Sequence, residues 1–200
     1  MKKGWLIALG VIVIAVAIPL FSVSGIYNSI VAKEQEVNQQ WGQVENVYQR
    51  RADLIPNLVA TVKGYAAHES EVLETVTASR AQVGSVRVTP EVLNNPAEFQ
   101  KFQAAQAGLS GALSRLMLVV EKYPDLKANE NFLDLQSQLE SSENRIALER
   151  KRFNESAQSY NTRIKQFPAN MVAGVFGFKD KQYFQSAPGS EKAPVVNFGK

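Results

Sequence analysis

The feature that most restricts the fold is a run of mostly large side chains whose spacing alternates between four and three residues. These positions, called the seam below, are Val37, Trp41, Val44, Tyr48, Arg51, Ile55, Leu58, Val62, Tyr65, Glu69, Val72 and Val76. A mean spacing of about 3.5 residues keeps one face of an α-helix against its neighbours. The seam therefore predicts a long helix over about residues 27–80 that packs against partner helices.

Pro56 interrupts the predicted helix. Proline has no amide hydrogen, and its ring crowds the carbonyl four residues earlier, which here belongs to Ala52. We therefore expect a structural kink or a break at Pro56.

The rest of the chain also reads as helix. Apolar residues at helical spacing predict helices over about residues 98–122 and 131–167, joined to the seam by a connector at 84–97. Residues 169–178 predict a short helix that is apolar nearly all round, and strand signals are almost absent. The predicted fold class is all-α: an N-terminal transmembrane helix continues into a coiled-coil-like antiparallel bundle of long helices, followed by the short apolar helix.

The N-terminus carries an uncharged apolar run over residues 4–26. As a helix it reaches about 34 Å, and a bilayer core is about 30 Å thick. We therefore expect an anchor at 1–26, a bundle at 27–178 and a flexible tail at 179–200. The alternative is a cleaved signal peptide, with small residues at Ser22 and Ser24.

Charge near the apolar run predicts the orientation. Lys2 and Lys3 precede it, and only Lys33 lies in the twenty residues that follow. The positive-inside rule then places the N-terminus in the cytoplasm and the helical domain outside it. Without Lys2 and Lys3 the net charge falls from +3 to +1. No clustered basic face remains, so nucleic acid is not expected as a partner.

The composition also argues against an enzyme. The chain has no cysteine and one histidine, His68. His68, Glu69 and Glu71 point in different directions on a helix, which does not suit a metal site. No phosphate-binding glycine loop occurs. We expect no catalytic residue, no metal and no cofactor.

The helix lengths predict an uncovered part of the seam. A straight helix over 27–80 is about 80 Å long, whereas one over 98–122 reaches about 37 Å. Val37, Trp41, Val44 and Tyr48 would then lack partners within one chain. Either a break at Pro56 folds residues 27–55 back, or neighbouring copies cover these side chains. The second solution, which makes them and Arg51 an oligomer seam, is the one we favour.

Polar residues at predicted core positions need partners. Arg51 and Glu69 are the charged members of the seam, and partners are expected on other helices: Glu143 or Glu149 for Arg51, and Arg145 or Arg150 for Glu69. Asn154 and Asn161 lie seven residues apart and, with Glu69, form a possible polar core. A structural ion pair or a solvated face is the alternative.

Several ordered motifs carry a family resemblance. They include Arg50–Val59 (RRADLIPNLV), Tyr123–Asn129 (YPDLKAN), Glu143–Ile146 (ENRI), Phe153–Asn154 and Phe167–Pro168. Over about residues 1–185 the chain resembles the LemA family of bacterial membrane proteins. The resemblance implies one N-terminal span, a helical bundle, no established catalytic activity and a link to membrane shaping and envelope organisation. Members have also been predicted with the N-terminus outside, which conflicts with the orientation expected from the lysines.

The leading hypothesis is a non-enzymatic, single-pass protein of the bacterial inner membrane. Its helical domain is expected to be periplasmic, to contact membrane lipid and to self-associate as an envelope scaffold. The alternative is an adaptor that uses residues 169–178 to bind a client, an envelope protein partner, for a membrane protease or secretion machine.

Overall fold

The computed structural model describes residues 2–86 and 89–185, and within these not the side chains of residues 2, 3, 6–8, 12–14 and 16–20. All regular elements in the described part are helical, which confirms the all-α class. They are α1 (Lys2–Tyr65), α2 (Ser70–Ser85), the 3-10 helix η1 (Pro90–Asn94), α3 (Pro96–Val120), α4 (Pro124–Lys127), α5 (Glu130–Lys165) and α6 (Ala169–Phe176).

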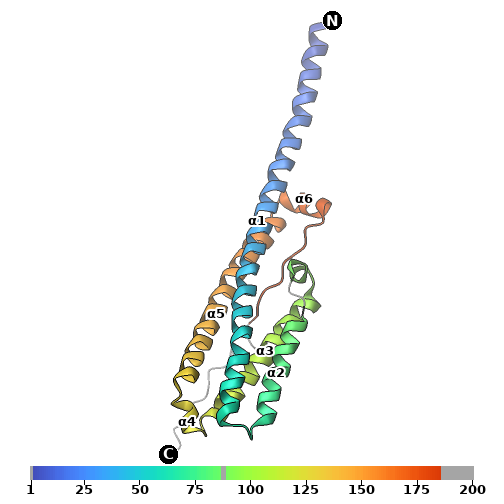
Figure 1. Cartoon of the computed structure of the whole chain (residues 1–200). Coiled ribbons are helices and arrows are strands. Elements are labelled where there is room, and N and C mark those ends of the chain that lie inside the picture. Colours follow the sequence, from blue (N-terminus) through green and yellow to red (C-terminus); the bar gives the residue numbers. More distant parts are fainter. Residues whose placement is uncertain (1, 87–88, 186–200) are drawn as a thin grey trace, which may run out of the picture.

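The long helices form an antiparallel bundle from which α1 projects (Figure 1). α2 returns beside the end of α1, α3 runs back along α2, and α5 returns along α1. Asparagine caps fix where α3 and α5 begin. The side chain of Asn95 accepts hydrogen bonds from the Ala97 and Glu98 amides, and that of Asn129 accepts one from the Phe132 amide.

The expectation of one helix over residues 27–80 is wrong. α1 ends at Tyr65, residues 66–69 form a turn, and α2 begins at Ser70. The spacing of the seam does not reveal this turn, because α1 and α2 both bury side chains in the same apolar cluster. Val62 of α1 and Val76 of α2 are both fully buried in one apolar cluster, so the apolar periodicity continues across a reversal of direction.

Of the kink or break expected at Pro56, the break is wrong, because α1 continues through it for nine more residues, and the kink stays a prediction. The carbonyl that proline leaves without its usual donor is that of Ala52. Arg80 of α2 donates from Nε to this oxygen at 2.9 Å. Pro56 itself is exposed. The turn at 66–69 thus places α2 beside α1, so that Arg80 can donate to the Ala52 carbonyl.

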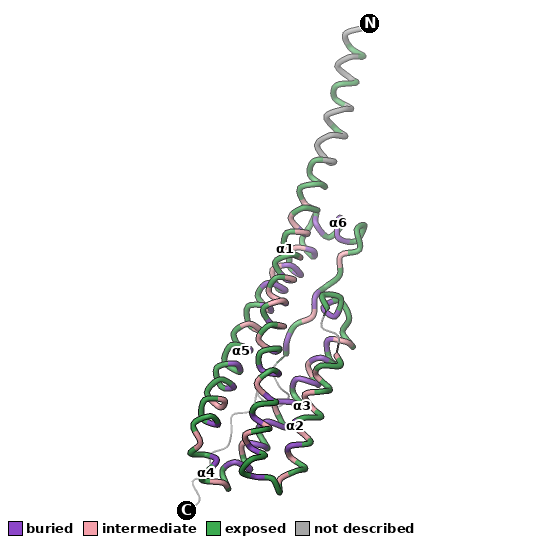
Figure 2. Tube along the Cα trace, viewed as in Figure 1, coloured by how far each residue is buried: buried purple, intermediate pink, exposed green. Residues whose placement is uncertain are grey.

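The core consists of two apolar clusters, one toward each end of the bundle. Burial follows one side of each long helix, as Figure 2 shows. The cluster nearer the projecting part of α1 includes Val37, Trp41 and Tyr48, and the distal cluster includes Ile55 and Leu58. Arg51 lies between them along α1 and is 1% exposed.

The seam is covered within a single chain, which corrects the expectation that copies must cover it. Val37 and Val44 are 0%, Trp41 1% and Tyr48 6% exposed. The comparison of lengths failed because α5, not α3, is the main partner of α1. α5 has 36 residues, about 54 Å, and residues 30–65 of α1 span the same length. Phe99 and Phe102 of α3 close the remaining side.

The anchor expected at residues 1–26 is not confirmed. Among the residues that the structure describes, none of the helices combines the length and the apolar character that crossing a bilayer requires. Much of that run, at residues 6–8, 12–14 and 16–20, has side chains outside the description. The remaining ones include exposed Trp5, Leu9, Val11 and Phe21.

Candidate functional site

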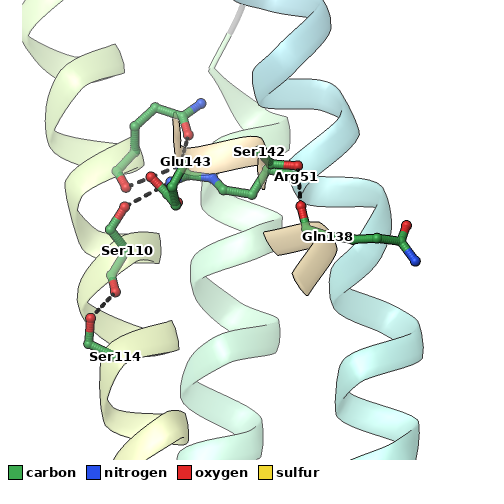
Figure 3. Close-up of polar contacts among 7 residues, drawn as sticks. Arg51, Ser110, Ser114, Gln138, Ser142 and Glu143 are labelled. Atoms are coloured by element: carbon green, nitrogen blue, oxygen red, sulfur yellow. Dashed lines mark hydrogen bonds and ion pairs between the residues drawn. The ribbon is translucent and has the colours of Figure 1, made fainter. Parts of the chain in front are cut away.

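The most polar part of the interior is centred on Arg51, in the middle of α1. Figure 3 shows its guanidinium between α3 and α5. Nη1 donates to Glu143 Oε1 at 2.5 Å and to Ser110 Oγ at 2.8 Å, and Nη2 donates to Gln106 Oε1 at 2.5 Å. Glu143, one of the two glutamates expected here, is therefore the partner, and Glu149 instead pairs with Arg152. We call Arg51, Gln106, Ser110 and Glu143 the Arg51 cluster.

The Arg51 cluster separates the two apolar clusters and joins three helices. A buried guanidinium is costly unless its donors are used. Both Nη atoms of Arg51 have acceptors, whereas its buried Nε has no partner among the described residues. Sliding one helix along another would take these acceptors away. The arrangement therefore fixes the register of α1, α3 and α5, which is the best-attested use of buried polar groups.

A cleft of about 330 Å³ opens beside the Arg51 cluster. Several of its polar side chains are already engaged within the chain: Ser110 accepts from Arg51, and Arg150 donates to the Gln185 carbonyl at 2.9 Å. The pKa of Tyr48, which lines the cleft, is raised chiefly by burial, so its phenol stays protonated. This chemistry holds segments together, and the described lining supplies no nucleophile paired with a base.

A segment expected to be a loose tail forms the other half of the site. Residues 179–185, called the strap below, run back into the bundle, and Lys181 and Phe184 are 3% and 6% exposed. A flexible tail beginning at 179 is therefore wrong for these seven residues, and the rest of the expected tail, 186–200, lies outside the described residues.

Two asparagines of α5 hold the strap through its backbone. Asn161 donates from Nδ2 to the Lys181 carbonyl at 2.9 Å and accepts from the Lys181 amide at 2.8 Å. Asn154 does the same with the carbonyl and amide of Phe184, both at 2.9 Å. A carboxamide matches an extended residue because it offers one donor and one acceptor side by side. The possible polar core is thus a pair of backbone clamps.

The side chains of the strap complete the apolar cluster nearer the projecting part of α1. The Phe184 ring stacks with Trp41 at a centroid distance of 6.1 Å and meets Phe153 edge-on at 5.5 Å. Lys181 donates from Nζ to Glu34 at 2.7 Å and lies over the Tyr160 ring. Burial raises the pKa of Tyr160 well above its ordinary value, so this phenol stays neutral. Because the Phe184 ring also lies 5.1 Å from that of Phe99 on α3, the strap joins α1, α3 and α5.

Glu69 is placed differently from expectation. It lies in the turn after α1, half-buried, and accepts a hydrogen bond from the Tyr123 hydroxyl at 3.2 Å. Among the described residues no ion pair joins Glu69 to Arg145 or Arg150, and Arg150 binds the strap instead. Sequence reasoning missed the strap altogether, although the seven-residue spacing of Asn154 and Asn161 was its signal.

Replacing Asn161 with alanine should release the strap. The change leaves the buried amide and carbonyl of Lys181 without partners, and each unpaired buried group costs about 1 to 3 kcal/mol. We expect a loss of about 2 kcal/mol in the free energy of unfolding and faster hydrogen exchange at the Lys181 and Phe184 amides.

Asn144→Ala is the matched control, because Asn144 lies on the same helix but is exposed. It should change neither quantity measurably. Unchanged exchange at Lys181 in the Asn161 variant would show that the clamp does not hold the strap.

No group of three or more His, Cys, Asp or Glu residues that could hold a metal occurs in the described part of the chain.

Comparisons with known proteins agree on one relationship. A family model described as the LemA family matches residues 40–198. The chain is 28% identical over 186 residues to magnetosome protein MamQ 2 of Paramagnetospirillum magneticum, covering 85% of this chain and 68% of that protein. It is 27% identical to magnetosome protein MamQ of Magnetospirillum gryphiswaldense, with the same coverage. It is 23% identical over 175 residues to protein LemA of Metamycoplasma hominis, covering 88% and 76%.

Proposed function

Since this chain belongs to the LemA family, we propose that it is a non-enzymatic, membrane-anchored protein that acts as a scaffold of the bacterial envelope. In this proposal residues 1–26 anchor the chain in the inner membrane, and the bundle stands outside the cytoplasm. The similarity to proteins named for magnetosomes supports a role at a membrane.

The observation that carries the proposal is the projecting part of α1. Trp5 is 71%, Val11 61% and Phe21 80% exposed, although their helix is continuous with the bundle core. Each large apolar side chain left in water forgoes about 1.5 to 3 kcal/mol. These exposed apolar side chains need a covering, and the uncharged sequence over 4–26 suits lipid.

Charges in the apolar run should abolish anchoring. We expect the full chain, expressed in bacteria, to stay in the membrane pellet after alkaline washing. A variant carrying Leu9→Arg and Val11→Asp should appear in the supernatant, because each charge near the bilayer centre costs about 2.5 to 3.5 kcal/mol.

Leu118→Arg with Leu148→Asp is the control, since both side chains are exposed on the bundle at 70% and 45%. This variant should remain in the pellet. Retention of the Leu9 and Val11 variant would overturn the proposed anchor.

The proposed scaffold also requires that copies of the chain associate. The seam does not support this association, because its side chains are buried within one chain. We place the contact between copies in the projecting part of α1, because this part extends beyond the bundle (Figure 1). The chain has no cysteine, so a single cysteine at Val23 can be oxidised in membranes without competing thiols. Disulfide-linked dimers are expected from Val23→Cys and not from Leu118→Cys. Their absence would remove self-association from the proposal.

The adaptor is the second candidate, and one observation favours it. α6 exposes Met171, Val175 and Phe176, in the segment that the sequence suggested for binding a client. An adaptor predicts that crosslinkers placed on α6 capture one foreign protein in stoichiometric amount.

A further inference from the structure

α6 carries an apolar stripe that faces away from the bundle. Its inner side chains are buried in the apolar cluster nearer the projecting part of α1: Ala169, Val172 and Ala173. Its outer side chains are large and exposed: Met171 64%, Val175 82% and Phe176 53%, with Phe167 at 80% just before the helix. The contacts of α6 with the bundle bury only one of its two apolar sides and leave the other in water.

The position of α6 indicates what covers the stripe. The Phe176 ring lies 4.8 Å from the Tyr27 ring of α1, centroid to centroid, and Phe178 lies 5.6 Å from the same ring. Tyr27 directly follows the uncharged run of residues 4–26. α6 therefore lies at the level where α1 leaves the bundle, and it runs across α1 there (Figure 1).

The charges around α6 fit a boundary between water and lipid. Lys33 pairs with Glu36 and Lys165 with Asp180, both pairs are exposed, and Lys179 is exposed just after α6. These charges are of both signs and nearly balanced, so the apolar stripe and not a basic field provides the attraction. The stripe of α6 itself contains no charged residue.

We propose that α6 is an interfacial helix that lies in the membrane surface, with Phe167, Met171, Val175 and Phe176 inserted among the lipid chains. A helix that lies in the plane of the membrane buries an apolar face at the boundary between headgroups and chains, and here the side of α6 opposite the bundle provides that face. Two contacts then fix the bundle to the bilayer, the proposed span and α6, so the bundle cannot turn about the axis of α1. This inference rests on the proposed anchoring of residues 1–26.

The test uses the full chain with single cysteines, which the absence of native cysteine makes specific. An environment-sensitive fluorophore is attached at Val175, at Phe21 or at Leu118, all exposed in the structure. The labelled proteins are reconstituted in phosphatidylcholine vesicles, with and without lipids brominated on their chains. At Val175 we expect a blue-shifted emission that brominated lipid quenches, most strongly when the bromine lies close to the headgroup. Leu118, at the far end of the bundle, should show neither effect.

The label at Phe21 separates the two proposals. If Phe21 is quenched and Val175 is not, the anchor stands and the interfacial helix is wrong. If neither is quenched, the proposed function fails as well. A blue shift at Val175 without quenching by lipid means that a protein covers the stripe, a client or a second copy, and overturns the inference. Val175→Glu should abolish quenching of a label at Met171 if lipid covers the stripe.

Discussion

Replacing Trp41 with alanine lowers the free energy of unfolding by about 4 kcal/mol, because truncating a large buried aromatic residue usually costs about 3 to 5 kcal/mol. The indole is 1% exposed and contacts the rings of Phe99, Phe102, Phe153 and Phe184. These rings belong to α3, α5 and the strap, so the cavity loosens three partners of α1 at once. Chemical denaturation of the full chain in detergent, followed by circular dichroism, measures the loss.

The only other tryptophan provides the control. Trp5 is 71% exposed in the projecting part of α1, and Trp5→Ala should change the unfolding free energy by less than about 0.5 kcal/mol. The oligomer size of folded Trp41→Ala should equal that of the unsubstituted protein. If Trp41→Ala kept normal stability but its oligomers dissociated, Trp41 would after all be a contact between copies.

Replacing Glu143 with leucine lowers the unfolding free energy by about 3 kcal/mol, because it leaves the Arg51 guanidinium buried without its counter-charge. The reverse change is milder. In Arg51→Met the stranded carboxylate is that of Glu143, whose side chain is 47% exposed and can be hydrated. We expect about 1 to 2 kcal/mol for this variant, mainly from the lost hydrogen bonds to Gln106 and Ser110.

The double variant, Arg51→Met with Glu143→Leu, should be more stable than Glu143→Leu alone, because it no longer buries a guanidinium without its counter-charge. The four proteins form a cycle whose coupling energy should reach about 2 kcal/mol. Glu140→Leu, an exposed glutamate on the same helix, is the control and should have little effect. Additive effects of the two single changes would mean that Arg51 and Glu143 do not stabilise the bundle as a pair.

The helices could be predicted because their apolar periodicity is local. Large residues recur every seven positions along α5, a local spacing that indicates a buried face, and Phe132, Leu139, Ile146, Phe153 and Tyr160 are all buried. The same repeat fails at Phe167, which is 80% exposed, because α5 ends at Lys165. A periodic pattern describes a face only as far as the helix that carries it.

Two features depended on contacts that no local pattern contains. The hairpin between α1 and α2 keeps the spacing of one helix, since both arms enter the distal cluster. The strap is a polar stretch with one buried aromatic residue, and its partners Asn154 and Asn161 lie 30 and 20 residues earlier in the chain. With the hairpin counted as one helix and α3 in place of α5 as the partner of α1, the lengths of the helices suggested an open seam.

The continuity of α1 has a mechanical consequence for a chain anchored through residues 4–26. Spans tilt by about 20° on average, and the tilt depends on how the span length matches the bilayer thickness. Because α1 passes from the apolar run into the bundle without a joint, the whole bundle leans with it. Over about 54 Å, a lean of about 20° carries the distal end sideways by about 18 Å. A change in membrane thickness would thus move the distal end of the bundle sideways.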